Sequence, residues 1–241
     1  MSDYSKSSVQ LDPVRHMGRR SVLIGLGAGA LGATGMAGQA MAATPVPVLP
    51  VPPNGALAFR IMRNGSVIGK HSLTFRQTGD TLLVEVAVEI LVKFGPIPVY
   101  RYVHRASETL RDGVLIAADG KTNDDGKAHS MTARLGPEGL VVNGSLSGRY
   151  VAPPGTMMAN HWNQDELKGP MVNPQGGKLL RPVVTPGPEE AIALASGKTV
   201  EAKRFNLSGD ARLDLWYDRD NVWASTRFSP EDGSEVLYER I

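Results

Sequence analysis

From Ala56 to the C-terminus, apolar and polar residues alternate with a period of two, not with the period of about 3.6 typical of a helix. In the stretch ALAFRIMRNGSVIGKHSLTFRQTGD, two alternating segments flank Asn64-Gly65, a pair that supplies the positive φ angles of a tight hairpin turn. Similar breaks recur at spacings of about eight to fourteen residues as far as Glu231-Asp232-Gly233. The sequence therefore predicts an all-β antiparallel meander of about ten or eleven strands, which forms a strongly curved sheet or open barrel.

One segment interrupts this pattern, PPGTMMANHWNQDELKGPM over residues 153–171. Thr156 is a candidate N-cap and Lys168-Gly169-Pro170 a stop signal, so we expect one short helix or lid segment at one end of the sheet. Trp162 and His161 could form a lid over a ligand, or Trp162 could plug the core while His161 faces water. No other shift in composition occurs, so residues 56–241 are expected to form a single domain.

The N-terminal region carries the features of an export signal. Arg19 and Arg20 precede an uncharged, glycine-rich run, and Ala40-Met41-Ala42 gives an A-x-A cleavage site. We interpret residues 1–42 as a twin-arginine-like signal peptide whose Arg19 and Arg20 are read by the twin-arginine export machinery. An ordinary secretory signal and a retained membrane anchor are the alternatives, and the prolines of the linker at 43–55 argue against the anchor. The predicted location is periplasmic or secreted, with no stable membrane span after cleavage.

Charge and composition exclude several functional classes. The chain has 26 Lys and Arg against 24 Asp and Glu, and its surplus of positive charge lies within residues 1–42. The remainder is formally neutral, so no overall basic field argues for nucleic acid or an anionic membrane surface. Cysteine is absent, which excludes disulfides and iron–sulfur clusters. None of the histidines has metal-ligand spacing, so we predict no metal site, and the sequence does not identify a cofactor.

The stretch VYRYVHRASETL contains the first group of candidate site residues. Because side chains alternate across a strand, Tyr100, Tyr102, His104 and Glu108 share one face. We predict that this face lines a concave pocket for a ligand, with Glu108 orienting His104 if the sheet bends. The alternative is a twisted rim of the sheet that is held by cross-strand Arg–Glu and Tyr–Arg pairs.

The stretch LDLWYD contains the second group, Asp214 and Trp216, on the face opposite Leu215. Asp214 could be a pocket carboxylate with a raised pKa, or a surface partner of Arg212 or Arg227. The ion pair is the commoner arrangement, and we favour it. The candidate binding residues are therefore Tyr100, Tyr102, His104, Glu108, His161, Trp162, Asp214 and Trp216.

Several stretches together resemble a known family: MRNGSVIGKHSLTF, VYRYVHRASETLRDG, NHWN, LSGDARLDLWYD and EDGSEVLYE. They are similar to segments of a bacterial export-targeted family, domain of unknown function 6134, and more distantly to the domain of unknown function 3108 family. The resemblance extends over residues 56–241. It implies an antiparallel β fold, similar to the curved sheets of lipoprotein carriers, and a location in the cell envelope. The resemblance implies no catalytic residues for this chain.

The leading functional prediction is a non-enzymatic envelope protein that binds or carries an apolar or amphipathic small molecule. It rests on the meander and on the absence of nucleophile motifs such as G-x-S-x-G and S-x-x-K. One alternative is an enzyme in which His104 acts as acid–base group, alone or with a metal, supported by Glu108 or Asp214. A second alternative is a structural or assembly partner in the envelope.

Overall fold

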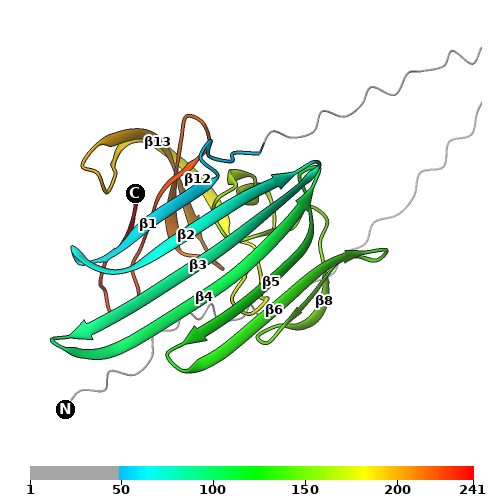
Figure 1. The fold of residues 1–241 in the computed structure, drawn as a ribbon, viewed down its shortest axis with the longest axis horizontal. Coiled ribbons are helices and arrows are strands. Elements are labelled where there is room, and N and C mark those ends of the chain that lie inside the picture. Colours follow the sequence, from blue (N-terminus) through cyan, green and yellow to red (C-terminus); the bar gives the residue numbers. More distant parts are fainter. Residues whose placement is uncertain (1–48) are drawn as a thin grey trace, which may run out of the picture.

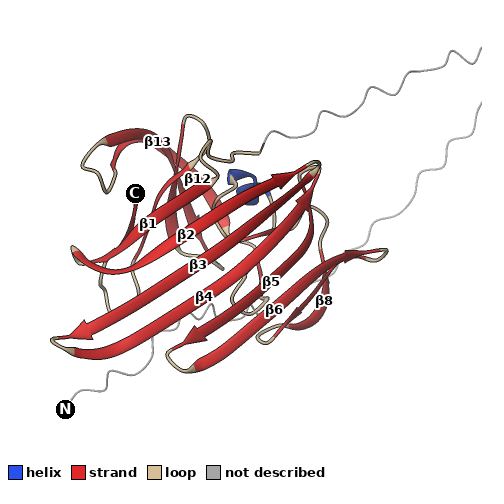
Figure 2. Cartoon of the chain, in the orientation of Figure 1, coloured by secondary structure: helices blue, strands red, loops and turns tan. Residues whose placement is uncertain are grey.

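The computed structural model describes residues 49–241, so the predicted signal peptide and the first part of the linker lie outside the described residues. Its main element is a 13-stranded antiparallel sheet that curves strongly (Figures 1 and 2). The strands of this sheet are β1 Ala56–Arg63, β2 Ser66–Thr78, β3 Thr81–Phe94, β4 Ile97–Arg111, β5 Val114–Asp124, β6 Lys127–Gly136, β7 Gly139–Gly144, β8 Gly148–Ala152, β12 Val183–Ala193, β13 Thr199–Ser208, β14 Leu213–Asp218, β15 Trp223–Phe228 and β16 Val236–Arg240.

The strand order is β12-β13-β14-β15-β16-β1-β2-β3-β4-β5-β6-β7-β8. The first and last strands of the domain are thus neighbours in the middle of the sheet, with Phe59 paired to Arg240. Strands β8 and β12 are the two edges, so the sheet is open. The predicted all-β class is confirmed, although the strand count is higher than expected. Strands β7 and β8, for example, are joined at Ser145-Leu146-Ser147, a turn without the Asn-Gly or Asp-Gly signature.

The hairpin turns form where the sequence predicts them. Asn64 and Gly65 both have positive φ, at 46° and 79°, and the same holds for Asp112-Gly113 and Asp125-Gly126. Two successive positive φ angles give the backbone the twist that matches the right-handed twist of the flanking strands. These turns fix the register of the long strands β1 to β6, and hence which side chains reach the concave face.

Residues 153–182, here called the inner segment, pack against the concave face of the sheet. They contain β9 Met157–Met158, the 3₁₀ helix η1 Gln164–Lys168, β10 Met171–Val172 and β11 Leu179–Leu180. The three short strands form a separate small sheet in the order β11-β10-β9. Buried residues of the inner segment, among them Trp162 and Met171, belong to the same apolar core as Phe59 and Leu73 of the main sheet.

The single helix was predicted in the right segment but with the wrong N-cap. Helix η1 is capped by Asn163, whose side-chain oxygen accepts a hydrogen bond from the Asp165 backbone N–H at 3.0 Å. Thr156 instead donates its hydroxyl to the carbonyl of Pro153 at 2.7 Å, a local turn contact that competes with capping. The helix ends at Lys168, followed by Gly169, as the stop signal indicated.

Two glycines let the inner segment lie directly on the sheet. A Cβ atom at Gly120 would be 2.0 Å from the carbonyl oxygen of Pro174, and one at Gly144 would be 2.2 Å from that of Gly176. Real Cβ atoms do not tolerate such distances, so glycine is required at both positions. The hydroxyl of Tyr150 also donates to the carbonyl of Gly177 at 2.7 Å.

Within residues 49–241, no helix has the length and apolar character needed to cross a membrane.

Candidate functional site

Three inward-facing side chains of β4 are polar or aromatic and still buried. Tyr102, His104 and Glu108 are 8%, 3% and 2% exposed, respectively. On the outer face of the same strand Arg105 forms an ion pair with Glu89 of β3. The cross-strand Arg–Glu pair of the alternative interpretation is thus present on the outer face, whereas Tyr102, His104 and Glu108 on the inner face are buried and line neither of the two surface hollows described below. The concave face is unusual in placing a carboxyl group and an imidazole inside an apolar core.

Glu108 lies against the inner segment. The side-chain amide of Asn160 donates a hydrogen bond to Oε1 of Glu108, and the indole N–H of Trp162 donates to the same oxygen at 3.3 Å. Burial raises the pKa of Glu108 to about 7, with a further contribution from the charge of Glu166, even though the two hydrogen bonds favour the ionised form. The carboxyl group thus changes its protonation near neutral pH while fully enclosed.

A second carboxylate, Glu166 of η1, is held by a single residue of the same segment. Its Oε1 lies 2.6 Å from Nδ1 of His161, and its Oε2 accepts the His161 backbone N–H at 2.9 Å. Glu166 is 1% exposed. His161 has a φ of 65°, a left-handed backbone conformation that a non-glycine residue adopts only when its surroundings impose it. Here the two contacts to Glu166 hold the His161 backbone in this conformation.

His71 of β2 faces the interior without a polar partner. Its ring lies 5.2 Å from Trp223 and 5.8 Å from Tyr238, both in edge-on orientation, and 6.2 Å from Phe59. Neither ring nitrogen has a hydrogen-bond partner. Burial lowers the pKa of His71 to about 3, and the charges of His161 and His104 add to the effect. The ring is therefore neutral at physiological pH.

His104 and Glu108 share one face of β4, with Ala106 between them. The two side chains do not form the predicted pair. Nδ1 of His104 lies 2.8 Å from the hydroxyl of Thr122, and its Nε2 has no partner. Burial lowers the pKa of His104 to about 4. The histidine–carboxylate pair on this face is instead His161 with Glu166.

Two tyrosines complete the concave face. The hydroxyl of Tyr217 is buried without a partner, and burial raises its pKa well above the usual value. Tyr100, nearer the end of β4, is half-buried and donates its hydroxyl to Asp124 at 2.7 Å. Four buried polar atoms of the described residues therefore lack a partner: Nδ1 and Nε2 of His71, Nε2 of His104 and the hydroxyl of Tyr217.

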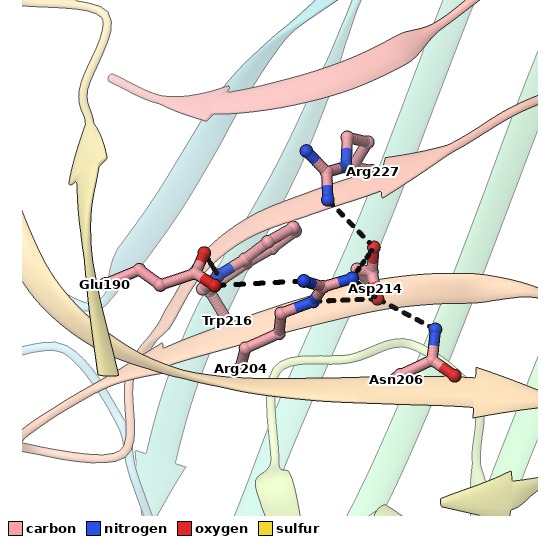
Figure 3. A network of polar contacts seen from close by, with 6 residues as sticks. All are labelled: Glu190, Arg204, Asn206, Asp214, Trp216 and Arg227. Carbon is pink, nitrogen blue, oxygen red and sulfur yellow. Dashed lines mark hydrogen bonds and ion pairs between the residues drawn. The ribbon is translucent and has the colours of Figure 1, made fainter. Parts of the chain in front are cut away.

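Asp214 and Trp216 lie apart from this group, on the outer face of β14. Asp214 accepts hydrogen bonds from Arg204, Asn206 and Arg227, and Arg204 is bidentate, with Nε donating to Oδ1 at 3.1 Å and Nη2 to Oδ2 at 2.9 Å (Figure 3). Burial alone would favour the neutral carboxyl, but these hydrogen bonds outweigh it and lower the pKa of Asp214. The ion pair with Arg227, favoured from the sequence, is present at 3.1 Å, and Arg204 replaces the predicted Arg212.

Trp216 packs within this network. The guanidinium groups of Arg204 and Arg227 lie 5.7 and 5.2 Å from the centre of its ring, and its indole N–H donates to Glu190 at 3.0 Å. It belongs to a small apolar cluster with Ala202 and Ala224, separate from the main core. The sheet therefore does not bring Asp214 and Trp216 together with Glu108.

The hollows of the surface lie away from the buried polar side chains. One of about 460 Å³ is at the end of the sheet that holds the β2–β3 and β4–β5 turns, lined by Leu49, Val51 and Leu110 among others. One of about 320 Å³ is on the outer face beside Ser72 and Arg105. The inner segment covers the group around Glu108, through Asn160 and Trp162.

Sequence reasoning missed four residues of this face: His71, Asn160, Glu166 and Tyr217. Asn160 belongs to the NHWN motif, whose polar residues lie between the apolar pairs Met157–Met158 and Met171–Val172. Polar residues enclosed by apolar pairs in this way indicate a buried polar group, and this was the signal in the sequence that could have identified Asn160. Among residues 49–241, no three His, Asp or Glu side chains converge in a way that could hold a metal ion.

Comparisons with known proteins agree with the architecture. A crystal structure described as a beta-barrel-like protein of domain of unknown function DUF1849 from Brucella abortus has a TM-score of 0.54 to this chain. The similarity covers 77% of this chain and 95% of the other at 9% identity, which establishes likeness of fold alone. No curated protein matches. The family model for domain of unknown function DUF6134 matches residues 59–241, from β1 to the end of the chain. The resemblance found in the sequence is thereby confirmed, and the chain belongs to the DUF6134 family.

Proposed function

We propose that the protein is an exported envelope protein that binds an amphipathic small molecule between the concave face of the sheet and the inner segment. The supporting observation is the set of unpartnered polar atoms on His71, His104 and Tyr217. A buried polar atom without a partner costs about 1–3 kcal/mol, so such atoms are rare in a core that serves packing alone. A ligand with hydrogen-bonding groups would give them partners.

The ligand that fits this face is uncharged, or carries a positive charge. No lysine or arginine is among the buried residues of the described chain, so nothing inside would neutralise an anion. The neutral imidazole of His71 can donate from one free nitrogen and accept at the other, and the Tyr217 hydroxyl can also do both, whereas the free Nε2 of His104 donates or accepts according to its tautomer. The surrounding rings and aliphatic side chains would hold the apolar part of the molecule.

The test is to purify the protein from the bacterial envelope, extract it with organic solvent and identify co-purifying molecules by mass spectrometry. We expect Tyr217→Phe to reduce ligand occupancy several-fold without destabilising the ligand-free protein, because its hydroxyl makes no hydrogen bond within the protein. Tyr150→Phe is the control. It removes the hydrogen bond to Gly177 and should lower stability by about 1 kcal/mol. Wild-type protein that yields no molecule and binds no apolar probe would refute the proposal.

An acid–base enzyme is the second candidate, and one observation favours it. His161 and Glu166 form a close pair beside Glu108, a carboxyl group with a pKa of about 7. The same experiment separates the two candidates. If the extracted molecule is chemically changed on incubation with fresh wild-type protein but not with His161→Asn, the protein is an enzyme. If it is bound and released unchanged, the protein is a carrier.

Export rests on residues 1–42, and its test is independent of the ligand. We expect residues 1–48 fused to a reporter to direct that reporter across the bacterial inner membrane, with cleavage near Ala42. The double variant Arg19→Lys and Arg20→Lys should abolish transport if the twin-arginine machinery reads the pair. Transport that persists in the double variant would identify an ordinary secretory signal instead.

A further inference from the structure

The β3–β4 hairpin extends beyond its neighbours in the sheet. The last pair of β2 with β3 is Gly69 with Ile90, and the last pair of β5 with β4 is Asp124 with Tyr102. Beyond these points, over residues 91–101, here called the hairpin tip, the strand ladder joins β3 and β4 only to each other. The one further backbone hydrogen bond of the tip among the described residues runs from the Asp125 N–H to the carbonyl of Arg101 at 2.8 Å. Figure 1 shows this hairpin reaching past the β5–β6 hairpin. A two-stranded ribbon of this kind has no sheet beside it to bury its side chains.

The hairpin tip is nevertheless apolar. Phe94 is 78% exposed, Ile97 60%, Val99 46% and Leu91 38%. The sequence from Phe94 to Tyr100, FGPIPVY, contains no charge. Exposed apolar side chains scattered singly need no explanation, but four gathered on one projecting tip indicate an interaction surface.

The backbone of the hairpin tip limits how deeply it can enter a membrane. The β3 and β4 residues pair across the hairpin, as in the pair of Phe94 with Ile97, so the groups that face the partner strand are engaged, whereas those on the two outer edges face water. Pro96 and Pro98 have no N–H to donate, which removes two donors near the turn. Because open edges are costly in hydrocarbon, the backbone suits the hydrated outer layer of a bilayer, from which side chains alone reach the acyl region.

Two basic residues flank the uncharged stretch in the sequence. Lys93 and Arg101 are exposed, and neither side chain forms an ion pair in the described part of the chain. Their long side chains can reach lipid phosphates while Phe94 and Ile97 enter the acyl region. Two carboxylates of the adjacent hairpin also contact the base of the tip. Asp124 accepts the Tyr100 hydroxyl, and Asp125 accepts the backbone N–H of Arg101 at 3.4 Å, so its negative charge lies near Arg101 while Lys93 has no acidic partner among the described residues.

We infer that the hairpin tip is a membrane-docking element that inserts Phe94 and Ile97 shallowly into a bilayer containing anionic lipid. The local combination of an apolar tip and two cations drives this contact, and the net charge of the domain does not contribute. The inference goes beyond the proposed function and does not depend on it. Docking would bring the Tyr100 end of the concave face to the lipid surface.

The experiment uses the full chain carrying Phe94→Trp, mixed with vesicles of phosphatidylcholine containing about one third phosphatidylglycerol. Trp162, Trp216 and Trp223 are buried, so the new indole is the exposed one among the described residues. We expect its emission to shift to shorter wavelength and to be quenched by brominated acyl chains. Val114→Trp, at the opposite end of β4 and β5 and also exposed, is the matched control and should show neither change.

Flotation with the same vesicles measures the strength of docking. Phe94→Ser with Ile97→Ser should weaken the partition attributable to the tip at least about tenfold, since each large apolar side chain contributes a factor of that order. Lys93→Gln with Arg101→Gln should remove the preference for anionic over zwitterionic vesicles. An unshifted, unquenched Phe94→Trp signal would overturn the inference. So would a tip-dependent self-association without vesicles, which would assign the surface to a second copy of the chain.

Discussion

At the scale of single residues, the concave face carries titratable groups whose burial favours their neutral forms. Burial raises the pKa of Glu108 and lowers those of His71 and His104. The raised pKa of the carboxyl group and the lowered pKa values of the histidines give the stability opposite dependences on pH. The histidines contribute stability that is present above about pH 6.5 and is lost as the pH falls toward their folded pKa values of about 3 and 4. Glu108 contributes stability at low pH.

The Glu108 contribution can be isolated with Glu108→Gln. The unfolded carboxyl titrates near 4.5 and the folded one near 7, so its contribution is full below pH 4.5 and is lost as the pH rises through 7. The stability of wild type relative to Glu108→Gln should fall across this window by on the order of 3 kcal/mol. Urea denaturation of both proteins at several pH values measures this difference, in which the histidine effects cancel. Glu201→Gln on the exposed face is the control, and a pH-independent difference for Glu108→Gln would contradict the argument.

The alternation of β4 was enough to predict which of its residues face inward, because the period of two is a local property of a strand. The partners of Glu108 were not predictable in the same way. Asn160 and Trp162 are separated from Glu108 by 52 and 54 positions, and no local pattern encodes so distant a contact. Asp214 shows the converse case, since its predicted partner Arg227 lies directly opposite it in the β14–β15 hairpin.

At the scale of elements, the inner segment determines access to the buried site. Its strands have two residues each, too few to show alternation, which is why the sequence predicted a helix or lid without the small sheet. The asparagine cap of η1 was missed because Thr156 offered a competing signal seven positions earlier in the same stretch. The hairpin turns, by contrast, are specified by adjacent pairs such as Asn64-Gly65, and the sequence predicted them correctly.

The seating of the inner segment depends on close backbone contact at Gly120. Gly120→Ala would place a Cβ atom against the Pro174 carbonyl, and neither backbone can yield freely, so we expect destabilisation by about 1–3 kcal/mol. Amide hydrogen exchange within residues 153–182 should accelerate. Gly136→Ala is the control, because a Cβ atom there has no neighbour within 4 Å. Equal exchange in both variants would show that the segment is held by other contacts.

At the scale of the whole molecule, the first and last strands of the domain pair with each other in the middle of the open sheet. Strand β16 lies between β15 and β1, and the backbone N–H of Ile241 donates to the carbonyl of Ala58 at 2.8 Å. The all-β class followed from the period of two, but this pairing did not, because nearly the entire length of the domain separates its partners. Contacts of such sequence separation carry a large loop-closure entropy.

Deleting residues 236–241 should therefore abolish cooperative unfolding. The deletion leaves β1 and β15 each unpaired along one edge and removes buried Val236, which exposes the core between the two halves of the sheet. Near-ultraviolet circular dichroism during urea titration measures the loss. Deletion of Ile241 alone, which is 68% exposed, should leave a cooperative transition with a slightly lower midpoint. A sharp transition in the longer deletion would show that β16 is dispensable.

The pairing of β16 with β1 also sets the timing of folding in the cell. Strand β1 is translated well before β16, so one of its edges stays unpaired while the strands between them are made. The central pairing of the sheet can form only once Val236–Arg240 has been translated, so the two halves of the sheet join late in synthesis.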